Sequence, residues 1–219
     1  MHKRGLRASI QLMKVALIAV GMVVSLGGSV AAHSGKPDAR SVLRQEMQIL
    51  WTGHAVWMRD YIIASTTGNE EKAALEERLL RNPEDFGFSI ARFYGIENSK
   101  KFADLLKAHA LIAFEAIEAA KSGDKTRLEA ADKKWHENGA DLASLLNQLN
   151  PRYWPRQSLS DAWNRHLSLT MNQISARLQK NWKDDVAAFD EDYDCILMLA
   201  ECITDGIIKQ FSSKFYSPS

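Results

Sequence analysis

Helical periodicity is the feature of this sequence that most restricts its fold. Apolar side chains recur at steps of three and four residues over long segments, which is the spacing of one face of an α-helix. No segment sustains the alternation of apolar and polar residues that a half-buried strand would need. We therefore predict an all-α chain with helices over residues 41–63, 69–81, 83–95, 99–121, 125–149, 158–178 and 181–211.

The predicted helices end at identifiable breakers. Ser41 is a plausible N-cap of the first helix, Pro83 is expected to stop the charged second one, and Gly95 to close the short third one. The segment 150–155, Asn-Pro-Arg-Tyr-Trp-Pro, is the clearest breaker in the chain. Long helices joined by short turns predict an antiparallel bundle of four to five long helices, with a short helical pair inserted at residues 69–95.

The N-terminus has the pattern of a secretory signal peptide. Residues 2–7 are basic, residues 15–26 are apolar, and small residues precede Ala32. We predict cleavage after Ala32, a flexible lead over 33–40 and a helical bundle domain over 41–215, in a periplasmic or secreted protein. An uncleaved membrane anchor is the competing interpretation, but glycines and the small-residue end favour cleavage. No later segment is apolar enough to predict a membrane span.

The charge of the chain is divided unevenly. The formal net charge is +1, but the first 32 residues carry four cations and no acid, which leaves 24 basic against 27 acidic residues in the remainder. A weakly acidic body argues against nucleic acid as a partner, because phosphate binding needs a surplus of Lys and Arg. The partners that we expect are a small molecule or a metal ion, and a homo-oligomer stays open.

Two cysteines, Cys195 and Cys202, lie seven residues apart in the last predicted helix. That spacing corresponds to about 10.5 Å of helical rise. A disulfide needs Cα atoms within about 7 Å. The two cannot bridge each other on a continuous helix, so we expect two small core residues, with an intermolecular bond as the alternative.

Three histidines on three different helices carry the functional hypothesis. His54, His109 and His166 each fall on an apolar stripe, at positions that could share one layer of an antiparallel bundle. Neutral imidazole is the commonest metal ligand, and three in one layer would suffice for a transition metal or haem. Asn138 occupies an equivalent inward position on a fourth helix, and Glu201 flanks the apolar face of the last one. We predict His54, His109, His166 and Glu201 as metal ligands.

Two other interpretations of the same residues stay open. The polar layer could be part of a pocket for a small molecule, with Trp57, Trp135 and Asn138 binding the ligand. It could also be purely structural, because a buried polar layer can fix the register of helices. In that case the chain would be a structural or protein-interaction bundle.

Motifs of the common enzyme classes are missing from the sequence. There is no Glu-x-x-His pair of the diiron bundles, no covalent haem motif, no phosphate-binding loop and no nucleophile elbow. No nucleophile or acid–base pair stands out. We rank an enzyme below a binding protein and a structural bundle.

Several short motifs occur together between residues 45 and 211. They are Leu50-Trp51-Thr52-Gly53-His54 with Trp57, the segment 79–86, Leu105-Leu106-Lys107-Ala108-His109, His166-Leu167-Ser168-Leu169-Thr170, and Gly206-Ile207-Ile208-Lys209-Gln210-Phe211. Together they resemble a family of small, largely uncharacterised bacterial helix-bundle proteins, some of which carry kinase or transferase labels. The resemblance implies that the three histidines belong together, and it implies no reaction. This chain departs from the pattern at Glu201, near which Asp is usual, and at Ser212, where Pro is frequent.

Overall fold

The computed structural model describes residues 38–216, and this part of the chain is entirely helical. The elements are α1 (Ala39–Thr67), α2 (Lys72–Ser122), α3 (Lys125–Leu149), α4 (Arg156–Leu178), α5 (Trp182–Gln210) and a terminal 3-10 turn, Ser212–Lys214. The predicted all-α fold is confirmed. The predicted signal peptide and most of the predicted lead lie outside the described residues.

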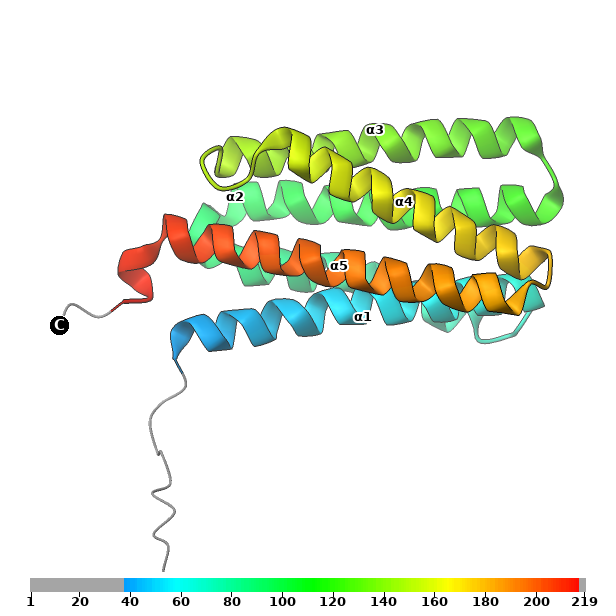
Figure 1. Cartoon of the computed structure of the whole chain (residues 1–219), viewed down its shortest axis with the longest axis horizontal. Helices are drawn as coiled ribbons and strands as arrows, with labels where there is room; N and C mark the ends of the chain where they lie inside the picture. The colour runs from blue at the N-terminus through cyan, green and yellow to red at the C-terminus, as the bar shows by residue number, and fades with distance from the viewer. Residues whose placement is uncertain (1–37, 217–219) are drawn as a thin grey trace, which may run out of the picture. The chain divides into compact units, whose positions relative to one another are not determined.

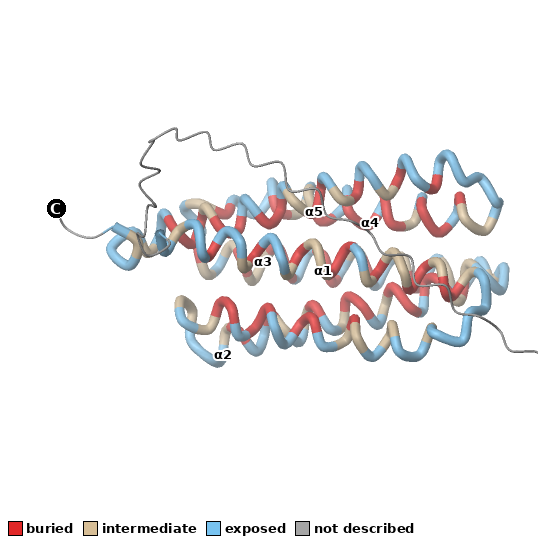
Figure 2. Tube along the Cα trace, turned by 90° about the horizontal axis from the view of Figure 1, so that it is seen from below, coloured by how far each residue is buried: buried red, intermediate tan, exposed pale blue. Residues whose placement is uncertain are grey.

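The five helices lie lengthwise beside one another (Figure 1). Helix α1 packs against α2 and α5, α3 packs against α2 and α4, and α4 packs against α5. Helix α4 also contacts α1 and α2, and the apolar stripes face a shared interior. Figure 2 shows the buried residues on the inner sides of the helices and the exposed residues on the outer sides.

Helix α2 folds back on itself at Gly95, so its two limbs, residues 72–94 and 96–122, pack against each other. Gly95 has φ 78° and ψ 168°, a conformation that only glycine adopts readily. Lys72 and Glu118 form an ion pair across the limbs, although a straight helix would separate them by about 69 Å. The prediction that Gly95 ends a helix is therefore confirmed.

The predicted break at Pro83 is wrong, because residues 72–94 form one continuous limb rather than a short helical pair. A proline inside a helix costs roughly 3 kcal/mol. Tertiary contacts offset this cost: Pro83 is buried beside the core residues Leu79 and Phe86. The amide of Asn82 also donates a hydrogen bond to the carbonyl of Leu50 in α1.

The predicted ends of the other helices are close to those observed. Helix α3 has the predicted bounds, whereas α4 starts at Arg156, two residues before its predicted start at residue 158. Helix α1 starts inside the predicted lead: its N-cap is Asp38, whose side chain accepts from the amide of Arg40. The predicted cap Ser41 is wrong. Asn181, at the predicted start of the last helix, caps α5: its Oδ1 accepts from the amide of Asp184.

The buried apolar residues form two clusters. One contains Trp51 and Trp163, and the other contains Met58, Trp135 and Leu167. Along α1 and α4, the histidine positions lie between members of the two clusters. The polar layer therefore sits where the two halves of the core meet.

Two smaller findings concern membranes and cysteines. Within residues 38–216, none of the helices combines the length and the apolar character needed to span a bilayer. Cys195 is buried and Cys202 is exposed, and neither forms a disulfide with another described residue. The expectation of two core cysteines is thus right for Cys195 and wrong for Cys202.

Candidate metal centre

His54 of α1, His109 of α2 and His166 of α4 converge inside the bundle. One ring nitrogen from each lies within 4.8 Å of the others. The residues are 6%, 0% and 2% exposed. Among the described His, Cys, Asp and Glu side chains, these three form the group that could hold a metal ion. The structure thus brings together the three predicted histidines.

The three imidazole rings are close neighbours but are not in direct hydrogen-bond contact. Their centroids are 6.2 Å apart for His54 and His109, 5.9 Å for His54 and His166, and 5.5 Å for His109 and His166. The last two rings are stacked, with 19° between their planes. The three rings are therefore mutual neighbours within one layer of the bundle.

Asp192 of α5 orients the ring of His166. Its Oδ1 lies 2.7 Å from Nδ1 of His166. Its Oδ2 accepts hydrogen bonds from Thr170 at 3.1 Å and from Gln173 at 2.9 Å. Nδ1 is thereby engaged, and Nε2 is buried with no hydrogen-bond partner among the described residues. Carboxylate–histidine pairs of this kind orient metal ligands in many proteins.

Asp192 was missed by the sequence analysis, which selected Glu201 instead. Glu201 is exposed, lines a groove with Arg44 and Gln48, and is not brought together with the three histidines. Asp192 is four residues before the buried Ile196 and therefore on the same face of α5. A carboxylate on an apolar stripe was the signal that could have identified it.

His109 is held by two side chains of α3. The amide nitrogen of Asn138 donates to the carbonyl of Leu105, so its Oδ1 is free to accept from Nδ1 of His109 at 3.0 Å. The tautomer that follows has a lone pair on Nε2, which accepts from the indole N–H of Trp135 at 3.2 Å. Both residues were predicted at the site, and both contact His109.

Burial keeps the imidazoles of His54 and His109 neutral at physiological pH. It lowers the pKa of His54 to about 4, assisted by the charge of His166 and opposed by Asp192 and Asn82. The pKa of His109 is also well below its ordinary value, first because of burial and then because of the other two histidines. Neutral imidazole is the form that ligates a metal.

Tryptophan rings surround the three histidines. Trp163 lies 5.3 Å from His109 and 6.1 Å from His166, and Trp51 lies 6.4 Å from His54, between ring centroids. Trp57, predicted to bind a ligand here, instead packs against the guanidinium of Arg78, 5.1 Å from its ring centroid. The environment of the site is therefore apolar and aromatic.

The geometry suits a small ion better than a haem. With metal–nitrogen distances of about 2.0–2.1 Å, tetrahedral ligand nitrogens would lie roughly 3.3 Å apart. The observed nitrogens, within 4.8 Å of one another, need modest side-chain rotations to reach such distances. A porphyrin does not fit between rings whose centroids are 5.5–6.2 Å apart. Of the two predicted cofactors, a metal ion fits this arrangement after such rotations, and a haem does not.

A buried ion network supports the site from the side of α1. Arg59 and Arg177 both pair with Asp185. Arg59 also donates a hydrogen bond to Oε1 of Gln173 at 3.5 Å, and Nε2 of the same side-chain amide donates to Asp192. The chain of contacts from Arg59 through Gln173 to Asp192 fixes the carboxylate that orients His166.

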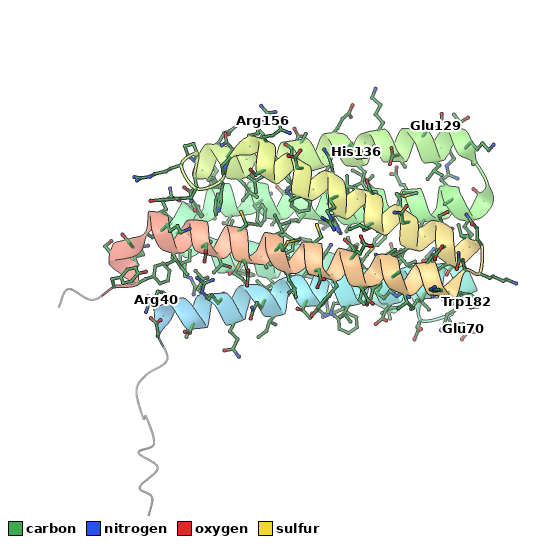
Figure 3. The ribbon with its side chains drawn as sticks, in the orientation of Figure 1. Arg40, Glu70, Glu129, His136, Arg156 and Trp182 are labelled. Atoms are coloured by element: carbon green, nitrogen blue, oxygen red, sulfur yellow. The ribbon has the colours of Figure 1, made fainter. Side chains whose placement is uncertain are left out.

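The outer surface carries the fourth described histidine. His136 on α3 (Figure 3) is half-buried and lies 2.9 Å, between Nδ1 and Oδ1, from Asn164 of α4. It does not belong to the central group. This makes His136 a suitable control position for the other three.

No protein-family model, curated protein or solved structure matches this chain. The resemblance to a bacterial helix-bundle family stays a prediction, and the function proposed below is inferred from the sequence and the geometry of the site.

Proposed function

We propose that this is an exported helical-bundle protein that binds a transition-metal ion through His54, His109 and His166. The observation that supports it is the convergence of three buried imidazoles, with one nitrogen of each within 4.8 Å of the others. Nε2 of His166 adds weight, because it is buried and has no partner in the described part of the chain. Buried polar atoms nearly always have a partner, and a bound ion would supply one.

The surroundings of the histidines fit the same role. Ligating histidines usually donate their second nitrogen to a carboxylate or carbonyl, which fixes the tautomer and the ring orientation. Asp192 Oδ1 is the hydrogen-bond partner of Nδ1 in His166, and Asn138 Oδ1 is the partner of Nδ1 in His109. Imidazole ligands suit zinc, copper, iron and nickel.

Export is supported by the sequence of the N-terminus. The basic residues 2–7, the apolar segment 15–26 and the small residues before Ala32 have the pattern of a cleaved signal. N-terminal sequencing of the protein recovered from its native cells tests this. We expect the chain to begin at His33, and a protein that keeps Met1 would contradict cleavage.

The metal site is tested by measuring metal content and by titration. The purified protein should bind about one equivalent of a transition metal, as detected by elemental analysis after removal of loosely bound ions. His166→Ala should lose the ion. His136→Ala should keep it, because that residue is outside the group. Failure to bind any transition metal, or equal losses in both variants, would refute the site.

A structural role for the polar layer is the second candidate. It is favoured by one observation: both nitrogens of His109 are already partnered, by Asn138 and Trp135. The protein would then be a structural or protein-interaction bundle. Replacement His109→Leu distinguishes the two candidates. A packing layer should tolerate the change and remain folded, whereas a metal site should lose affinity for its ion.

A further inference from the structure

We infer that the ion bound by the three histidines is monovalent and soft, of the Cu(I) class, rather than Zn(II). This inference rests on the proposed metal site and adds the identity of its ligand. It follows from the charge that is buried beside the histidines, from the donors that are free to coordinate, and from sulfur atoms in a neighbouring groove.

The buried charge beside the histidines amounts to a single carboxylate. Asp192 is 6% exposed, and its hydrogen-bond partners are His166, Thr170 and Gln173. The arginine that contacts Gln173, Arg59, is itself paired with Asp185. A monovalent ion held by three imidazoles, which ligate in their neutral form, would balance the charge of the Asp192 carboxylate. A divalent ion would leave one positive charge uncompensated in an apolar core, which is costly.

While Nε2 of His109 is occupied by Trp135, the free donors are fewer than the three or four protein ligands that zinc uses. Structural zinc takes four ligands, and catalytic zinc keeps three protein ligands and a water. Here Nε2 of His109 accepts from Trp135, and both oxygens of Asp192 are engaged by other side chains. No described Cys, Asp or Glu joins the group. Cu(I) and Ag(I) are stable with two or three neutral donors, which the histidines supply.

The nearby groove between α4 and α5 contains three sulfur atoms. Cys195, Met198 and Cys202 of α5 line a cavity of about 300 Å³ together with Ala162 and Arg165 of α4. Met198 is 55% exposed, and the Cys195 thiol lies 3.6 Å from the carbonyl of Ala162.

The groove adjoins the proposed site. Cys195 is one turn from Asp192 on α5, and Arg165 precedes His166 on α4. Thiolates and thioethers are soft ligands that bind Cu(I) well, and thiolates also bind zinc. A soft ion that enters from the surface on this side of the bundle would first meet the sulfur atoms of the groove.

The test compares two metals on the same full-length protein. Cu(I) is titrated anaerobically with ascorbate in competition with a chromophoric Cu(I) chelator, and Zn(II) is titrated against a chromophoric zinc chelator. We expect one equivalent of Cu(I) to be bound and Zn(II) to be left with its chelator. Ag(I), which has the same charge and preferences without redox chemistry, should raise the thermal unfolding temperature as Cu(I) does.

A matched pair of variants tests the role of charge. Asp192→Asn removes the charge and keeps the size of the side chain, and should weaken Cu(I) binding by about 10–100-fold. Asp194→Asn, at an exposed position of the same helix, should leave it unchanged. Replacing Met198 by Leu should slow the loading of Cu(I) without changing its final affinity.

The possible outcomes separate this inference from the proposed function. Zn(II) bound as tightly as Cu(I), or full Cu(I) affinity in Asp192→Asn, would overturn the monovalent assignment and leave the metal site standing. Binding of neither metal would refute the metal site itself. If Asp192→Asn does not fold, the comparison of Cu(I) with Zn(II) on the unmodified protein still decides between the two ions.

Discussion

Acid should destabilise the metal-free protein well above the pH at which carboxylates are protonated. His54 is neutral when buried, with a pKa of about 4, whereas the unfolded chain has the ordinary value of 6.5. The unfolded state therefore binds more protons between these two values, and stability falls as pH falls. The contribution is fully present above pH 6.5 and is lost progressively down to about pH 4.

The magnitude follows from the size of the pKa shift. One pKa unit corresponds to about 1.4 kcal/mol, so at pH 4.5 the His54 contribution alone amounts to about 2.5 kcal/mol relative to neutral pH. His109, whose pKa is lowered further, adds to the same loss. This is a large fraction of the 5–15 kcal/mol that is typical of the free energy of unfolding of a domain.

Urea unfolding at pH 7.5 and pH 4.5, with a chelator present, measures the effect. The variant His54→Gln has no titratable group at this position, so its loss of stability between the two pH values should be smaller by about 2.5 kcal/mol. His136→Gln should behave as the unmodified protein does. An unmodified protein and His54→Gln with the same pH dependence would show that His54 is not buried in its neutral form.

Two further predictions concern packing around the site and at the end of the bundle. Trp135→Phe removes the N–H that occupies Nε2 of His109. The replacement should lower the free energy of unfolding by about 1–3 kcal/mol and should tighten metal binding in a titration. Unchanged or weaker binding would contradict competition between the indole and the metal. Gly206→Ala would place a Cβ 2.0 Å from Nε1 of Trp154 and should lower the free energy of unfolding by about 3 kcal/mol or more. The control Gly53→Ala, where the nearest atoms are 3.9 Å away, should stabilise by about 0.5–1 kcal/mol, and equal effects of the two would contradict the packing at Gly206.

The convergence of the three histidines could be predicted because each lies on a regular apolar stripe. In a bundle, residues on such stripes face the interior whatever the details of packing. The bounds of α3 were predicted for a similar reason, since Gly123 and the segment 150–155 mark its two ends. Where a local sequence signal is strong and no tertiary contact opposes it, the sequence alone predicts where a helix ends and which face is buried.

Some predictions failed because tertiary contacts override a local sequence signal. Another failed because a residue was assigned to the buried face of its helix without calculating its angle around the helix axis. Pro83 is a strong breaker in isolation, but the contacts of its limb with α1 outweigh its cost. Glu201 is five residues after Ile196, which places it about 140° around α5, whereas Asp192 is about 40° away. The hydrogen bond from Trp135 to His109 depends on side-chain rotamers that no sequence pattern reveals.

X-ray absorption spectroscopy of the metal-loaded protein tests the metal site most directly. We expect a first shell of two or three imidazole nitrogens at about 2.0 Å, with the imidazole scattering lost when His54, His109 and His166 are replaced by Gln. A shell of oxygen atoms that is the same in the protein with and without the three histidines would contradict a metal centre inside this bundle.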